Sequence, residues 1–209
     1  MKAFVLFTIV LGFVHFNNLN AQEENIKADP RYWTTHNSTA TFEKGSIHLV
    51  KKGEGSALLW LNDINFENGT VELEIKGKDV RGQSFLGLAF HGSDNERYDA
   101  VYFRPFNFKN SEKKYNSVQY INAPENVWHV LRNRFPGKYE NVVNPVPDPN
   151  DWFHIKITID TPNIKVYLNG SEEPTLAIEK ISTGNEGKLG LWIDSKDGWF
   201  RNVRITPKP

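Results

Sequence analysis

Cysteine is absent from the 209 residues of this chain. The absence excludes disulfides, thiolate metal ligands and cysteine nucleophiles, as well as the lipid-modified cysteine that anchors a bacterial lipoprotein. An excess of charge of one sign is also missing, because 25 Lys and Arg residues balance 25 Asp and Glu residues. Since the charges alternate along the chain, the sequence predicts neither nucleic-acid binding nor attachment to an anionic membrane.

Long apolar runs are confined to the beginning of the chain. Residues 3–16 are mainly apolar, Lys2 precedes them and the small residue Ala21 follows, which is typical of a secretory signal peptide over residues 1–21. The run is too short for a membrane span of roughly 20 apolar residues. We therefore expect a secreted or periplasmic bacterial protein without membrane insertion. Residues 22–209 have the length of a single domain, which we expect to be monomeric.

Helical periodicity is also scarce, and alternation of apolar and polar residues takes its place. In the segment 153–160, for example, Phe153, Ile155, Ile157 and Ile159 alternate with polar residues, as in a half-buried antiparallel strand. Turns rich in Asn, Gly and Pro separate such segments, and together they predict an all-β sandwich or jelly roll. The expected strands are residues 46–51, 57–61, 71–76, 84–91, 98–104, 117–121, 153–160, 164–169, 175–178, 188–193 and 199–205.

One segment, residues 123–151, departs from this alternation. Pro124 suits the first turn of a helix, and apolar residues follow at helical spacing, so we expect a short helix ending at Leu131. Four proline residues come after it; they forbid regular strand pairing and stiffen the chain. A long Pro-rich loop of this kind is uncommon unless it has a function. Two interpretations stay open: a lid over a polar sheet face, or a strap over an exposed sheet edge.

Residues 84–104 form two expected strands, and one of their two faces has an unusual composition. One face carries only apolar core residues, whereas the other combines aromatic rings, an imidazole and a guanidinium with the small residues Gly87 and Ala89. A solvated face would carry Lys, Glu and Thr instead, and small residues leave space above a sheet. The pattern therefore predicts a face that receives a polar, ring-shaped ligand.

Strand parity selects the residues of this face. Tyr98, Tyr102 and Arg104 share it, the neighbouring strand adds His91, and Gln119 fits it better than Tyr120 does. An Arg buried in a sheet needs a partner, because an unpaired buried charge costs several kcal/mol. Aromatic faces bind the C–H surface of a sugar, while polar groups bind its hydroxyls. The candidate ligand-binding residues are His91, Tyr98, Tyr102, Arg104, Gln119, Trp128, Arg132 and Glu140.

Three of these candidates lie in the segment 123–151 and have a second interpretation. Arg132 and Glu140 could close over the ligand, or they could pair with each other and pin the loop. Trp128, like Trp152, could be a sugar platform or a core anchor. No dense spacing of metal ligands is present in the sequence, so we assign no metal site; Asp194 and Asp197 could hold a calcium ion or form an ordinary tight turn.

The order of these segments resembles that of a known group of proteins. The stretches "GQSFLGLAFHG", "YDAVYFRPFNF" and "GKLGLWIDSKDGWFRNVRI" resemble the concanavalin A-like jelly rolls of secreted bacterial proteins, in particular laminin G-like and 3-keto-disaccharide-hydrolase-like domains. The resemblance covers residues 46–205. It implies an all-β, concanavalin A-like jelly-roll β-sandwich, with one short helix and a long Pro-rich loop here, but this fold hosts many functions.

The residues of the polar face and the resemblance together suggest three functions. We predict a secreted carbohydrate-binding domain that takes a saccharide on its concave face. The alternatives are a hydrolase or lyase resembling the 3-keto-disaccharide hydrolases, with Glu140 or His91 as general base, and a laminin G-like adhesion module. Laminarinase-type glycosidases of this fold carry paired catalytic carboxylates on one strand. The nearest pair here, Glu72 and Glu74, is interpreted as a solvated strand face, because its alternation partners are core residues.

Overall fold

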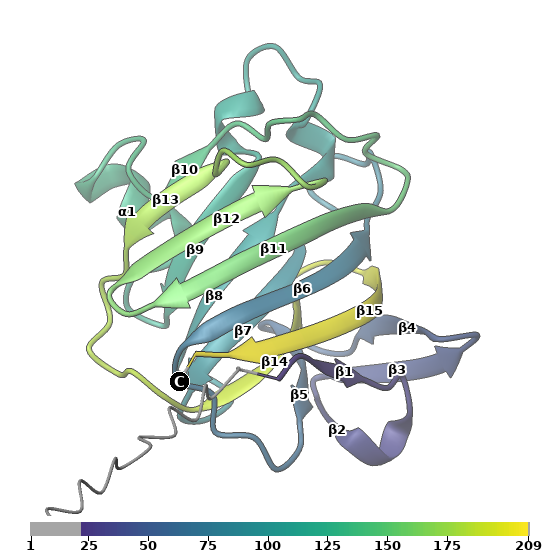
Figure 1. Cartoon of the computed structure of the whole chain (residues 1–209). Coiled ribbons are helices and arrows are strands. Elements are labelled where there is room, and N and C mark those ends of the chain that lie inside the picture. Colours follow the sequence, from purple (N-terminus) through teal and green to yellow (C-terminus); the bar gives the residue numbers. More distant parts are fainter. Residues whose placement is uncertain (1–21, 209) are drawn as a thin grey trace, which may run out of the picture.

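Two antiparallel β-sheets pack face to face and form a sandwich, as the sequence predicts (Figure 1). The computed structural model describes residues 22–208. The expected signal peptide, residues 1–21, lies outside the described residues. Within residues 22–208, no helix is long and apolar enough to cross a membrane.

The first sheet has eight strands. In the order β13-β12-β11-β6-β15-β4-β3, with β1 added beside β15, all neighbours run antiparallel. The strands are β13 (Leu176–Glu179), β12 (Asn163–Leu168), β11 (Phe153–Asp160), β6 (Gly69–Lys76), β15 (Asp197–Pro207), β4 (Ser46–Lys51), β3 (Ser38–Glu43) and β1 (Glu24–Ile26).

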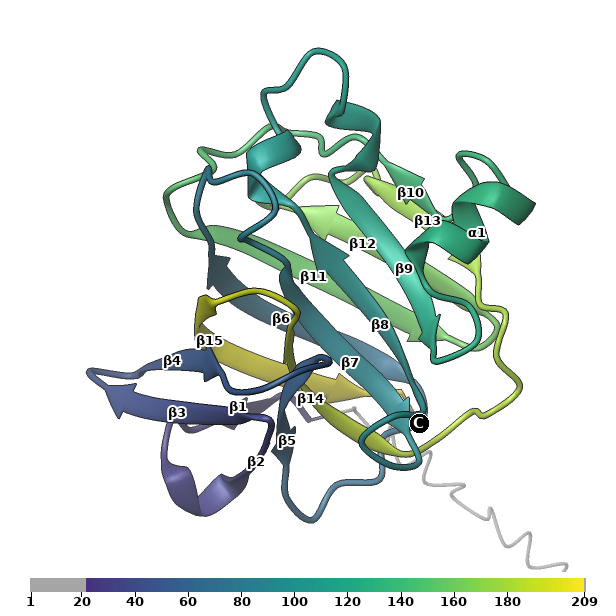
Figure 2. The same ribbon diagram turned by 180° about the vertical axis from the view of Figure 1, so that it is seen from behind.

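The second sheet has seven strands and is seen from its outer side in Figure 2. Its order is β10-β9-β8-β7-β14-β5-β2. The strands are β10 (Glu140–Asn141), β9 (Val118–Ala123), β8 (Tyr98–Phe103), β7 (Leu86–Gly92), β14 (Lys188–Ile193), β5 (Ala57–Leu61) and β2 (Trp33–His36).

The core lies between the two sheets and follows from the alternation in the sequence. Along β11, the residues from Phe153 to Ile159 at every second position are at most 1% exposed, and their polar neighbours face solvent. Leu88 and Val101 face them from the seven-stranded sheet and are equally buried. Burying one such side chain stabilises the fold by roughly 1.5–3 kcal/mol, so this alternation favours the sandwich over other arrangements.

The segment 123–151 contains the helix and covers a sheet edge. The helix α1 (Trp128–Arg134) begins later than Pro124 and extends past Leu131, where the sequence predicted its end. Beyond the helix, β10 pairs with the edge strand β9, and Asn141 donates a 3.0 Å hydrogen bond to the carbonyl of Thr175, just before β13. The second half of the segment is therefore a strap along this edge, whereas α1 stands beside the outer face.

The sequence did not predict four of the strands. β1, β2 and β3 precede the expected strands, and β10 lies in the Pro-rich segment. Three short 3-10 helices, Pro30–Tyr32, Pro105–Asn107 and Lys114–Asn116, also occur. The alternation in β3 is between half-buried and exposed residues, so its hydrophobic signal is weak; β10 has two residues and too little length for a pattern.

Candidate functional site

A single row of paired residues crosses the seven-stranded sheet. Trp192 pairs with Gly87, Gly87 with Tyr102, Tyr102 with Gln119, and Gln119 with Glu140. Because directly paired residues of antiparallel strands point to the same side, all five face the outer side of this sheet. The predicted parity of Tyr102 and Gln119 is therefore confirmed.

Aromatic rings fill the space above the small residues of this face. The rings of Trp192 and Tyr102 lie two strands apart, yet their centroids are 4.7 Å from each other above Gly87. The indole Nε1 of Trp192 donates a 3.1 Å hydrogen bond to the hydroxyl of Tyr98, and Trp60 packs edge-on against Tyr98. The gap expected above Gly87 is thus closed by rings, which form a continuous aromatic floor.

Arg104 is a buried cation whose hydrogen-bond acceptors are neutral. It is 5% exposed. Its Nη1 donates to the carbonyl of Asn116 at 2.9 Å, and its Nη2 donates to the hydroxyl of Tyr102 at 2.6 Å and to Oε1 of Gln119 at 3.5 Å. The guanidinium carbon also lies 4.8 Å from the centroid of the Tyr102 ring. These contacts hold the side chain in one position.

Burial disfavours the charged forms of both Arg104 and Tyr102. Burial lowers the pKa of Arg104, and the nearby cation of Arg132 lowers it further, although the Tyr102 and Glu140 side chains act in the opposite direction. Burial raises the pKa of Tyr102 to about 12 despite the adjacent Arg104. Tyr102 is therefore a neutral phenol at physiological pH, and Arg104 stays charged because a guanidinium does not lose its proton in proteins.

Gln119 lies on the predicted face but is sealed from solvent at 1% exposure. Its amide nitrogen donates to the carbonyls of Tyr120 at 2.9 Å and Tyr139 at 3.0 Å. This fixes the amide so that Oε1 points toward Arg104. Gln119 therefore orients the guanidinium and does not itself reach a cavity.

Arg132 and Glu140 form the ion pair that the sequence left open as an alternative. Arg132 Nε donates to Glu140 Oε1 at 2.7 Å, and Arg132 Nη2 donates to Oε2 at 2.5 Å. The hydrogen bonds to Glu140 raise the pKa of Arg132. Glu140 is only 7% exposed, and Arg132 binds both of its oxygens, so it is poorly placed as a general base.

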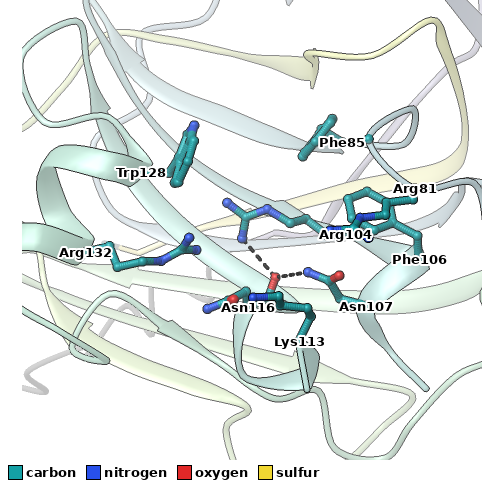
Figure 3. A pocket seen from close by; sticks show the side chains of 10 residues that line it. Arg81, Phe85, Arg104, Phe106, Asn107, Lys113, Asn116, Trp128 and Arg132 are labelled. Carbon is teal, nitrogen blue, oxygen red and sulfur yellow. Dashed lines mark hydrogen bonds between the residues drawn. The ribbon is translucent and has the colours of Figure 1, made fainter. Parts of the chain in front are cut away.

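Two adjacent cavities lie over the outer face of the seven-stranded sheet and meet at Trp128. The smaller, about 320 Å³, is drawn in Figure 3: the Arg104 guanidinium lies between Trp128 and Phe85, and Arg132 extends toward it from α1. The larger, about 590 Å³, has Tyr98, Tyr102 and Trp192 in its wall. The smaller cavity is lined by Arg81, Gly82, Phe85, Arg104, Phe106, Asn107, Lys113, Asn116, Trp128 and Arg132.

The assignment of His91 to this face is wrong. Between Ala89 and Gly92 the pairing with β14 shifts register, which adds one residue to β7, and His91 adopts a positive φ of 50°. Such a bulge reverses the parity of the strand. The imidazole therefore enters the interior of the sandwich, where its side chain is fully buried and Nε2 lies 2.7 Å from the carbonyl of Glu67.

His91 belongs instead to a buried polar cluster between the sheets. Lys180 Nζ lies 2.9 Å from His91 Nδ1 and 3.1 Å from Asp99 Oδ2. Tyr120 and Ser182 donate to Asp99 at 2.6 Å each. Burial acts to raise the pKa of Asp99, but His91, Lys180, Ser182 and Tyr120 together outweigh burial and lower it. Because every member is engaged inside the cluster, it braces the end of the sandwich. His91 and Asp99 line a separate cavity of about 410 Å³ at that end and neither of the two cavities over the outer face.

Several residues that line the cavities were not among the predicted ones. Trp192 lines the larger cavity. It shares the outer face with Trp60, and the alternation of these two residues with Leu191 and Leu59 was a usable signal. His36 and His129 line the larger cavity, and Arg81 and Lys113 line the smaller one. These four come from β2, α1 and connecting segments, where no strand alternation indicates the direction of a side chain.

The carboxylates considered for catalysis or calcium binding are neutralised by basic side chains. Glu74 accepts two 2.9 Å hydrogen bonds from Arg201 and lies on the eight-stranded sheet, as expected for a structural residue. Asp194 pairs with Lys51 at 2.8 Å and Asp197 with Lys78 at 2.8 Å. A calcium ion would have to displace both lysines. Within residues 22–208, no group of three or more acidic or His side chains is arranged to hold a metal ion.

Sheet order, buried core and outer-face cavities together define a jelly-roll sandwich of the concanavalin A-like class. Solved structures with this fold include the carbohydrate binding module CBM66 from Bacillus subtilis (20% identity, TM-score 0.59, 83% of this chain and 94% of that one). A putative glycosyl hydrolase from Parabacteroides distasonis has 15% identity and TM-score 0.57 over 87% and 90% of the two chains. The Ca²⁺- and Man3GlcNAc-bound VIP36 exoplasmic/lumenal domain has 11% identity and TM-score 0.56 over 86% and 85%. At these identities the likeness establishes the fold alone.

Residues 19–206 match the model of the 3-keto-alpha-glucoside-1,2-lyase-like domain. The chain belongs to this family. No curated protein matches the chain.

Proposed function

We propose that this protein binds a saccharide on the outer face of its seven-stranded sheet. The observation that carries the proposal is the aromatic floor of Tyr98, Tyr102 and Trp192, which lines a cavity of about 590 Å³ and adjoins the smaller cavity at Trp128. Aromatic rings offer apolar contact to the C–H face of a sugar, and the polar groups around them offer hydrogen bonds to hydroxyls. Trp128, which is 45% exposed, is available as a platform at the junction.

Affinity electrophoresis with a panel of neutral and acidic polysaccharides tests the proposal. Trp128→Ala is expected to weaken binding about fivefold or more, because stacking of a ring on a sugar contributes roughly 1 kcal/mol or more, while the melting temperature stays nearly unchanged. Trp152→Ala is the matched control, since this Trp packs against Lys76 and Arg201 of the other sheet. Equal retardation of the two variants, or no retardation by any polysaccharide, contradicts the proposal.

A lyase acting on 3-keto sugars is the second candidate, favoured by the family to which the chain belongs. In such a reaction a base removes the proton beside the keto group, the C–H electron pair forms a C=C bond, and the neighbouring glycosidic C–O bond breaks as its oxygen takes a proton. Neither Glu140 nor His91 lines the two cavities over the outer face, where this base would have to act. His36 and His129 line the larger cavity and are the imidazoles available for proton transfer there.

Incubation with a 3-keto-glucoside and detection of the unsaturated sugar by mass spectrometry test the lyase. His36→Gln or His129→Gln is expected to lower the rate by about 100-fold or more if that residue is the base. His154→Gln, on the eight-stranded sheet, is the control. No product, or an unchanged rate in both variants, excludes these roles. An adhesion module without a ligand cavity is less well supported, because two cavities lie over the predicted face.

Export of the protein is part of the same proposal. The apolar run 3–16 supports a signal peptide that is removed after Ala21, so that the exported chain begins at Gln22. N-terminal sequencing of the protein recovered from the periplasm or medium tests this. Recovery of the intact N-terminus from the cytoplasm contradicts it. The expected monomeric state is tested on the same sample by size-exclusion chromatography.

A further inference from the structure

The smaller cavity carries a strong excess of positive charge. Arg81, Arg104, Lys113 and Arg132 line it, whereas its lining contains no carboxylate. Arg132 is neutralised by Glu140. Within residues 22–208, no Asp or Glu forms an ion pair with Arg81, Arg104 or Lys113, so three cations stay uncompensated around one cavity of about 320 Å³.

Arg104 is the most informative of these cations, because it is 5% exposed. A buried charge without a countercharge is expensive, and proteins normally pair it. The acceptors of Arg104 are a hydroxyl, an amide and a carbonyl, and all are neutral. Its guanidinium forms part of the cavity wall beside Trp128 (Figure 3). A countercharge can therefore come from whatever occupies the cavity.

The walls around the cations have the chemistry of a sugar subsite. Phe85 and Phe106 contact each other edge to face at 5.3 Å on one side, and Trp128 stands on the other with Arg132 4.8 Å above its ring. The side chains of Asn107 and Asn116 add amides. A guanidinium forms short, strong hydrogen bonds with planar or tetrahedral oxyanions, and the rings suit the apolar face of a pyranose.

We propose that the smaller cavity is a subsite for an acidic sugar, one that carries a carboxylate or a sulfate ester, with Arg104 as the central contact and Arg81 and Lys113 at the rim. This inference rests on the proposed saccharide binding and specifies its ligand. The charge of the larger cavity has the opposite sign: Glu54 and Glu96 line it, together with Asp194, which Lys51 neutralises, and its lining contains neither Lys nor Arg. The anionic group of the ligand is thus directed to the smaller cavity alone.

Paired polysaccharides that differ only in charge test the inference by affinity electrophoresis and calorimetry. Polygalacturonate is compared with its methyl-esterified form, and dextran sulfate with dextran; the first pair probes a carboxylate and the second a sulfate. We expect the protein to bind at least one charged member ten- to a hundredfold more tightly than its neutral partner. The double variant Arg81→Gln/Lys113→Gln, which alters only exposed side chains, should lose about tenfold or more of that difference.

A variant outside the cavity shows whether the preference for charged polysaccharides comes from the cavity or from nonspecific attraction between charges. Lys44 is exposed in the turn between β3 and β4 and does not line the cavity. Lys44→Gln should leave the preference intact, whereas Lys113→Gln should reduce it. Equal losses in these two variants, or equal binding of charged and neutral members, overturn the acidic-sugar subsite while saccharide binding stands. Failure to bind any polysaccharide overturns both.

Discussion

The Nη2 of Arg104 donates a 2.6 Å hydrogen bond to the phenol oxygen of Tyr102, two residues earlier on the same face of the sheet. The phenol stays neutral because burial raises the pKa of Tyr102 to about 12. The bond therefore holds the guanidinium in place without cancelling its charge. An arginine fixed in this way keeps its full electrostatic attraction for a ligand.

The first prediction concerns this fixed geometry. Arg104→Lys keeps the charge but cannot reach the three acceptors that the planar guanidinium reaches. We expect the free energy of unfolding to fall by about 1–2 kcal/mol and the affinity for the preferred acidic polysaccharide to fall about tenfold, measured by urea denaturation and calorimetry. Arg97→Lys, which changes an exposed arginine paired with Asp94, should change neither. Unchanged affinity in Arg104→Lys would assign this arginine to the scaffold.

The second prediction concerns the close approach of strands at Gly87. A Cβ added at Gly87 would lie 2.0 Å from the carbonyl oxygen of Val101 and would push against the backbone of β8. Gly87→Ala should lower the free energy of unfolding by about 1–3 kcal/mol and separate the rings of Trp192 and Tyr102, with a change in near-ultraviolet circular dichroism. Gly184→Ala, whose Cβ meets nothing within 4 Å, is the control. Equal stability of the two variants would be inconsistent with this packing.

The third prediction separates stability from binding at the Arg132–Glu140 pair. Glu140→Gln removes the carboxylate that neutralises Arg132, so the free energy of unfolding should fall by about 1–3 kcal/mol. The same change adds one uncompensated cation to the smaller cavity, and binding of the preferred acidic polysaccharide should become tighter. Stability is measured by urea denaturation and affinity by calorimetry. Weaker binding in a folded variant would show that Glu140 contributes to the ligand site directly.

The fourth prediction concerns pH and the buried cluster around Asp99. The pKa of Asp99 is lowered in the folded protein, so its stabilising effect is present above the unfolded-state value near 4 and is lost as the pH falls through the folded-state value. Asp99→Asn leaves Lys180 without its countercharge and should lower the free energy of unfolding by roughly 3–5 kcal/mol at pH 7. The difference from the wild-type protein should shrink below about pH 4.

The pH series of Asp99→Asn needs a comparison with an exposed acid. Asp160 is about half exposed and pairs with Lys208 at the surface, so Asp160→Asn should change stability by at most about 0.5 kcal/mol at any pH. Denaturant titrations from pH 3 to pH 7 provide the measurement. A destabilisation of Asp99→Asn that is constant over this range would show that charge is not what Asp99 contributes.

The sequence predicted the sandwich and the outer-face residues well, because one rule governs both. Alternation with a period of two places Tyr98 and Tyr102 on one side of β8, and the register of the sheet confirms that placement. Arg104 follows the last residue of β8 and contacts the hydroxyl of Tyr102. The same rule failed at His91, where a bulge inserts one residue and turns the side chain inward. A bulge depends on how two strands pair, which alternation within one strand cannot reveal.

The solvent exposure of a side chain was harder to predict from the sequence than the side of the sheet that it faces. Gln119 faces the expected side, yet Tyr139 and Glu140 cover it because the strap at β10 folds back along β9. The contributions of Arg81 and Lys113 were likewise invisible in the sequence, since they depend on how the segments around β8 converge. Residues on strands could be placed from the sequence, whereas those on connections required the tertiary structure.

Trp128 lies between a cavity lined by basic side chains and a cavity lined by Glu54, Glu96 and the Lys51-paired Asp194. A polymer lying across Trp128 would have one end near basic side chains and the other end near acidic side chains. Turning the polymer end for end would exchange those surroundings, so the two orientations differ in energy for any chain whose charge is unevenly distributed. The proposed saccharide binding therefore implies that the surface distinguishes the reducing from the non-reducing direction of such a polymer.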